Sequence, residues 1–279
     1  MHSLPEHVFF VILSHNLETM ANILNIETST SVCSVALGSD GQIVDHHENY
    51  DGQTHATLLS QFIDDMLNTA KRKDMKLDAI AVSIGPGSYT GLRIGLSQAK
   101  GLAFGLDIPL IGVNTLQLLT VTAMFQEFFD DDVLFVPMID ARRMEVYTAV
   151  YNNALEAIME PQPMILDENS FGDLLESNYL VFMGNGSDKA RDIIERKVEG
   201  GRYDEEMTTL NSQQNERTVS RSRFTIHNTH FLPGIKPVAV EMLALSEKAF
   251  RENHFIDVAY STPLYLKDFQ ATVPKKKVL

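Results

Sequence analysis

The order of apolar segments along the chain constrains its fold more than any other feature. Three short strand-like runs come first, at residues 22–26, 32–37 and 42–47, with turn residues between them. Helical and strand-like segments then alternate: helix 54–70, strand 77–84, helix 88–105, strand 109–113 and helix 115–129. This alternation predicts an α/β sheet with helices packed on its faces.

A second unit begins at Asp132, and its first strands resemble the start of the first unit. The runs 133–139 and 145–151 are strand-like, and Ile26-Glu27 and Ile139-Asp140 each place an acid at a strand end. An alanine follows nine residues after each acid, at Ala36 and Ala149. The shared spacing is either coincidence or the sign of a duplicated strand, acidic turn and strand.

The rest of the chain divides into weaker patterns. We predict a strand at 179–183, a helix from Ser187, a helix at 237–250 and a strand-like run at 260–266. A polar insertion or loop lies near 199–223. The domain boundaries that follow are 20–131 and 132–268, with a leader or mis-assigned start at 1–19 and a basic tail at 269–279.

Targeting and redox signals are few. The apolar run at 8–13 is too short for a signal or membrane segment and has no basic flank. Cys33 is the single cysteine, which excludes an internal disulfide and a multi-cysteine zinc site. We therefore expect a cytoplasmic protein that does not contact a membrane.

Charge is distributed unevenly along the 279 residues, whose net charge is −14. The first basic residue is Lys71, and nine acids precede it: Glu6, Glu18, Glu27, Asp40, Asp45, Glu48, Asp51, Asp64 and Asp65. This acidic quarter is either a solvated face or a docking surface for a more basic partner. The net charge is a poor match to nucleic acid for the chain alone.

Small residues recur every four positions where the strand 77–84 gives way to a helix. They are Gly87, Gly91, Gly95, Ala99 and Ala103. The spacing matches neither the dinucleotide fingerprint nor the P-loop. Glycine inside a helix costs ~1 kcal/mol relative to alanine, so the stripe predicts compensation by close packing, either on the chain's own sheet or on a partner helix.

Patterns for catalysis are absent from the sequence. Ser88 is not in a nucleophile-elbow motif, and no H-E-x-x-H or H-x-x-x-H pair occurs. The acidic turns are the best chemical candidates, with Glu27, Thr28 and Ser29 in the first and Asp140 in the second. Their side chains either cap turns or hold a magnesium ion through water.

Four segments carry a resemblance to known proteins: I-L-N-I-E-T-S-T (23–30), I-G-P-G-S-Y-T-G-L-R-I-G (84–95), I-D-A-R-R-M-E-V-Y (139–147) and P-L-Y-L-K (263–267). The tandem acidic turns resemble those of actin-like ATPases. The four segments together resemble the bacterial TsaB family, also called YeaZ, from about Met20 to Asp268. This resemblance implies an α/β fold of two tandem actin-like (ASKHA, ribonuclease-H-like) subdomains, each a mixed sheet with helices on its faces.

The resemblance also implies a function. Members of that family are required for threonylcarbamoyl modification of the adenosine next to the anticodon in tRNA. They pair with the catalytic subunit TsaD, the ATPase TsaE docks on the pair, and they self-associate when alone. By this resemblance the chain would reach tRNA only through the complex, with no catalytic residue, cofactor or metal of its own. ATP or ADP and the metal would bind the partner subunits.

Departures from the catalytic paralogue support a scaffold. TsaD carries an H-x-x-x-H metal pair after a valine–asparagine step, whereas Thr115 and Leu119 stand at those positions here. Its first turn also carries an acid where Thr30 and Ser31 stand. The chain therefore lacks two imidazole ligands and one carboxylate, and only weak nucleotide contact by Glu27, Thr28, Ser29 and Asp140 is expected.

The scaffold hypothesis places a partner interface on the two helices at 54–70 and 88–105. Its expected residues are Leu58, Leu59, Phe62, Met66, Gly87, Gly91, Arg93, Gly95 and Ala99. Two alternatives stay open. One is a stand-alone ASKHA-type ATPase or kinase, and the other is a glycoprotease-like peptidase, which needs a nucleophile or metal.

Overall fold

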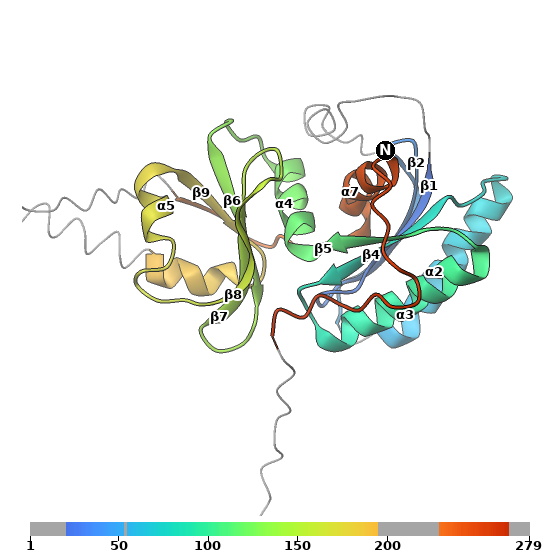
Figure 1. Cartoon of the computed structure of the whole chain (residues 1–279), viewed down its shortest axis with the longest axis horizontal. Helices are drawn as coiled ribbons and strands as arrows, with labels where there is room; N and C mark the ends of the chain where they lie inside the picture. Colours follow the sequence, from blue (N-terminus) through green and yellow to red (C-terminus); the bar gives the residue numbers. More distant parts are fainter. Residues whose placement is uncertain (1–20, 53–54, 195–228, 268–279) are drawn as a thin grey trace, which may run out of the picture.

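The computed structural model describes residues 21–52, 55–194 and 229–267 (Figure 1). The predicted leader at 1–19, the polar insertion near 199–223 and the tail at 269–279 lie outside these residues, so they stay predictions. None of the helices described is both long and apolar enough to cross a membrane.

The first sheet has five strands in the order β3-β2-β1-β4-β5. Their bounds are β1 Asn22–Glu27, β2 Cys33–Ser39, β3 Gln42–Asn49, β4 Ala79–Gly85 and β5 Leu110–Asn114. β2 lies antiparallel to both β1 and β3, while β1, β4 and β5 run parallel. This mixed sheet confirms the predicted strands to within two residues at each end.

The second sheet has the same strand order, which reads β8-β7-β6-β9-β10 from its antiparallel edge. Its strands are β6 Val133–Asp140, β7 Glu145–Tyr151, β8 Ala157–Ile165, β9 Tyr179–Met183 and β10 Thr229–Leu232. The directions also match, because β6 and β7 are antiparallel whereas β6, β9 and β10 are parallel. The duplicated unit is therefore confirmed in its topology.

The two alanines that share the same spacing, Ala36 and Ala149, do not occupy equivalent positions in the two hairpins. In the first hairpin Ala36 lies opposite Asn25. In the second, Thr148 lies opposite Met138, the position equivalent to Asn25. The second hairpin is one residue tighter, so Ala149 does not take the place of Ala36.

One face of the first sheet is covered by α2 (His55–Arg72) and α3 (Tyr89–Leu106). The apolar stripe of α2 packs inward, with Leu59, Ile63 and Met66 buried against the core strands. Ser88 begins α3 as its N-cap, since its hydroxyl accepts a hydrogen bond from the Gly91 amide. The expected helices are confirmed, with bounds shifted by one or two residues.

The opposite face is covered by a helix from the far end of the chain. α7 (Ala239–Arg251) packs on β1, β2 and β5, as Figure 1 shows. Its Met242 lies among Ile23 and Ala81, and a side chain at Gly38 would collide with Leu243. The predicted boundary, which placed residues 132–268 in the second unit, is therefore wrong for α7.

The last described residues follow α7 back along the first unit. Ile256 N donates to Leu110 O (2.8 Å) and Leu264 N donates to Ile84 O (2.7 Å). The strand predicted at 260–266 is wrong, because this segment is irregular. Pro263 has no amide proton, so it cannot extend a strand ladder.

Between the sheets lies α4 (Thr115–Gln126), which contacts β6 and α7. Its residues are buried on both sides, Leu118 with the first sheet and Leu119 with the second. Such a helix needs no amphipathic stripe. In the second unit, α5 (Gly172–Ser177) and a helix that begins at Ser187 complete the core around Phe182.

Candidate functional site

The first acidic turn begins where β1 ends. Glu27 is fully buried, and its Oε1 accepts a hydrogen bond from Ser29 N (2.5 Å). Its Oε2 has no hydrogen-bond partner among the described residues. Burial raises the pKa of Glu27 to about 7, because the charged carboxylate loses its hydration and the hydrogen bonds from Ser29 offset this only in part.

The glycine stripe of α3 packs on this turn. A Cβ at Gly91 would lie 2.1 Å from the Thr28 carbonyl oxygen, and one at Gly95 would lie 2.2 Å from Thr28 Oγ1. Thr28 Oγ1 donates to Gly91 O (2.9 Å), and Ser88 N donates to Ser29 O (2.6 Å). Only glycine permits this approach, so the stripe is accounted for by packing inside the chain.

The predicted partner interface is wrong for the residues that this packing buries. Five of its residues are buried within the first unit and offer no free surface: Leu59, Met66, Gly91, Gly95 and Ala99. Gly87 is partly exposed, but a Cβ there would lie 2.3 Å from Ser29 O. Leu58, Phe62 and Arg93 reach the surface, and their place in an interface stays a prediction.

Arg93 contacts a pair of tyrosines on the exposed side of α3. Its guanidinium lies 4.1 Å from the Tyr89 ring centroid, and its Nε donates to Tyr265 Oη (2.9 Å). The two tyrosine rings are 5.2 Å apart. Because Tyr265 comes from the irregular C-terminal segment, sequence spacing gave no sign of this cluster.

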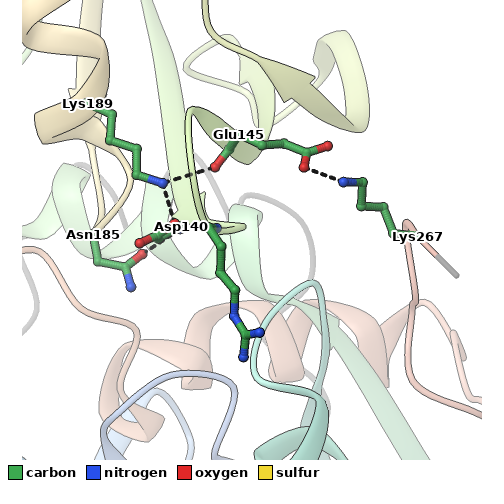
Figure 2. A network of polar contacts seen from close by, with 6 residues as sticks. Asp140, Glu145, Asn185, Lys189 and Lys267 are labelled. Atoms are coloured by element: carbon green, nitrogen blue, oxygen red, sulfur yellow. Dashed lines mark hydrogen bonds and ion pairs between the residues drawn. The ribbon is translucent and has the colours of Figure 1, made fainter. Parts of the chain in front are cut away.

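The second acidic turn is exposed, and its Asp140 is held by hydrogen bonds and an ion pair (Figure 2). Asp140 Oδ1 accepts from Lys189 Nζ (2.5 Å) and from Arg142 N (2.6 Å), and Asp140 N donates to Asn185 Oδ1 (2.9 Å). Lys267 pairs with the Glu145 carboxylate across the hairpin. Glu27 and Asp140 thus occupy equivalent strand ends in opposite environments.

The hollow between the two turns is small. Its volume is about 30 Å³, and it is lined by Thr30, Ser31, Leu119, Ile139, Asn185, Ile235, Lys236 and Pro237. Neither Glu27 nor Asp140 lines it. Pockets for ligands of drug size measure ~300–1,000 Å³, so this hollow is too small for a nucleotide.

The metal-ligand positions of the catalytic paralogue are filled by core side chains. Thr115 and Leu119 are buried in α4, and Asn114 caps that helix through Leu116 N (2.8 Å). No cluster of three or more His, Cys, Asp or Glu side chains suited to a metal occurs in the described ranges. Cys33 is buried, and burial raises its pKa to about 11, so its thiol is protonated at neutral pH.

A family model described as "TsaD: tRNA N6-adenosine threonylcarbamoyltransferase" matches residues 42–275. A Bacillus subtilis relative, "tRNA threonylcarbamoyladenosine biosynthesis protein TsaB", is 33% identical over 181 residues, which cover 62% of this chain and 75% of the relative. The Haemophilus influenzae protein of the same name is 29% identical over 88% of this chain and 93% of its own length.

A solved structure has the same fold as this chain. "YeaZ from Pseudomonas aeruginosa" superposes with a TM-score of 0.65 at 22% identity, over 88% of this chain and 100% of that structure. The fold is therefore that of two tandem actin-like subdomains, as the resemblance implied. The chain belongs to the TsaD-like group of such proteins and, within it, to the TsaB (YeaZ) family.

Proposed function

We propose that this chain is a non-catalytic scaffold subunit for threonylcarbamoyl modification of the adenosine next to the anticodon in tRNA. It would act in the cytoplasm by heterodimerising with a TsaD-like catalytic subunit and recruiting a TsaE-like ATPase. The names of the relatives support a role in this biosynthesis.

The small volume of the hollow between the acidic turns is the observation that supports a non-catalytic role. With a volume of about 30 Å³, it has no room for a nucleotide. The core packing of Leu119 further disfavours a metal at the position of the paralogue's ligands. ATP or ADP and the metal would therefore bind the partner subunits, with at most weak nucleotide contact at Glu27, Thr28 and Ser29.

The exposed side of α2 and α3 is the proposed partner surface. Arginine and tyrosine are enriched among residues that dominate interface energies, and Arg93, Tyr89 and Tyr265 already form a preorganised cluster. Leu58 and Phe62 add apolar area beside it on α2. The same surface would support self-association of the isolated chain, and tRNA would be bound only through the complex, given the net charge of −14.

Reconstitution tests the proposal. tRNA modification is measured with purified TsaD-like and TsaE-like subunits, with this chain present or omitted. We expect modification only when it is present, and full modification without it would overturn the proposal.

A charge reversal tests the surface in the same system. Arg93→Glu should weaken association with the TsaD-like subunit by at least about 30-fold, the scale of a hot-spot residue. Lys73→Glu makes the same change at an exposed site beyond α2 and should leave association unchanged.

The stand-alone enzyme alternatives have their own assays. An ATPase or kinase would hydrolyse ATP in a metal-dependent reaction that Glu27→Ala abolishes. A peptidase would cleave protein substrates with or without sensitivity to a chelator. We expect neither activity from the isolated chain.

A further inference from the structure

The hairpin between β6 and β7 ends in two arginines with unusual backbone conformations. Arg142 has φ = 74° and Arg143 has φ = 52°, so both lie in the left-handed region. Glycine and asparagine occupy that region more readily than arginine. Two adjacent arginines at such positions suggest that their side chains serve a purpose other than turn formation.

Neither guanidinium group is paired with an acid in the part of the chain that the structure describes. Arg142 and Arg143 are exposed, and their side chains form no hydrogen bond or ion pair with the described residues. The two acids at the base of the hairpin are each paired with a lysine: Asp140 with Lys189, and Glu145 with Lys267. The hairpin therefore carries a local excess of two positive charges on a chain whose net charge is −14.

The base of the hairpin holds this tip in place (Figure 2). The Arg142 amide donates to Asp140 Oδ1 (2.6 Å), and the Glu145 amide donates to the Arg142 carbonyl (3.1 Å). Lys189 Nζ also donates to the Glu145 carbonyl (3.3 Å). A tip anchored on both sides loses little conformational freedom when it binds a ligand.

We propose that Arg142 and Arg143 bind the phosphate backbone of tRNA. Guanidinium groups form paired hydrogen bonds with phosphate oxygens, and phosphate contacts supply sequence-independent affinity. This inference rests on the proposed function, because the acidic remainder of the chain would repel RNA unless the other subunits bind it too.

Binding of tRNA to the reconstituted complex tests the inference without any chemistry. The double substitution R142Q/R143Q removes both charges, and affinity is measured at several salt concentrations by fluorescence anisotropy. The expected loss is on the order of tenfold near 0.1 M salt. The slope of log affinity against log salt should become shallower by about 1.4–1.8, at ~0.7–0.9 per phosphate contact.

Two further variants guard against other causes. R142N/R143G places residues that favour the left-handed region at the tip, so it should fold well and lose the same affinity. K71Q/K73Q removes two exposed charges at the end of α2 and should leave both the affinity and the slope unchanged.

Three outcomes overturn the inference. An unchanged salt slope in R142Q/R143Q would show that the tip does not contact phosphate. Loss of association with the TsaD-like subunit in the absence of tRNA would assign the tip to an acidic protein surface instead. An equal loss of tRNA affinity in K71Q/K73Q would show that the effect comes from the net charge of the chain and not from the hairpin. The proposed function fails on a different result, namely full modification without this chain.

Discussion

Replacing Gly95 by alanine tests the assignment of the glycine stripe to internal packing. The new Cβ would lie 2.2 Å from Thr28 Oγ1, a fully buried hydroxyl that donates to Gly91 O. Overpacking of this kind costs ~1–3 kcal/mol, and a buried hydroxyl that loses its hydrogen bond costs ~1–3 kcal/mol more. Alanine returns up to ~1 kcal/mol of helix propensity, so the expected net loss is about 3 kcal/mol.

Urea and thermal unfolding of the isolated chain measure this loss. A destabilisation of about 3 kcal/mol lowers the Tm by roughly 6–12 °C, at ~2–4 °C per kcal/mol for a unit of this size. Gly101→Ala is the matched control on the same helix, because a Cβ there meets no atom within 4 Å. It should stabilise the chain by up to ~1 kcal/mol.

Internal packing of the stripe is refuted if Gly95→Ala is as stable as the natural chain or if Gly95→Ala and Gly101→Ala change the stability alike. An interface role for the stripe makes the opposite prediction, since the substitution would then weaken partner binding and leave the unfolding midpoint unchanged. Measuring both quantities on one preparation separates the two hypotheses.

Three further substitutions give measurable outcomes. Burial raises the pKa of Glu27 from 4.5 to about 7, so the free energy of unfolding is highest below pH 4.5 and falls by roughly 3 kcal/mol as the pH rises to about 7. Glu27→Gln should remove this pH dependence. The prediction is contradicted if the difference in unfolding free energy between the natural chain and Glu27→Gln stays the same from pH 4.5 to 8. Arg143→Gly should raise the free energy of unfolding by about 1 kcal/mol, since glycine tolerates a positive φ; a destabilised variant in urea unfolding would show that the side chain supports the fold. Lys267→Ala should lower the free energy of unfolding by at most about 1 kcal/mol, because the Lys267 side chain is 39% exposed. A double-mutant cycle with Glu145→Gln, run at low and high salt, measures the interaction energy of the pair. An interaction energy that does not change with salt would argue against an ion pair.

Local periodicity was enough to predict most elements of the first unit. The strands β1, β2 and β4 are short, nearly continuous apolar runs because both faces of the sheet are covered, whereas α2 carries the helical period that one buried face imposes. β8 was missed because Pro161 and Pro163 interrupt it, and prolines are tolerated there only because β8 is an edge strand that pairs with β7 alone.

Periodicity indicates that one face of an element is buried, but it does not identify the element or partner that covers this face. The stripe of Gly91 and Gly95 therefore fitted a partner helix as well as the turn at Thr28, and only the distances decide between them. For the same reason α7 was predicted as a helix but assigned to the wrong unit. The burial of Glu27 was equally invisible, since nothing in the local sequence distinguishes it from the exposed Asp140.

The position of α7 has a consequence for biosynthesis. During translation the first sheet emerges early, yet its second face is apolar and stays uncovered until residues 239–251 have left the ribosome. Nascent chains of intermediate length would therefore expose Ile23, Ala81 and Val113 to chaperones and proteases. Truncation before α7 should yield an aggregation-prone product instead of an independent amino-terminal half.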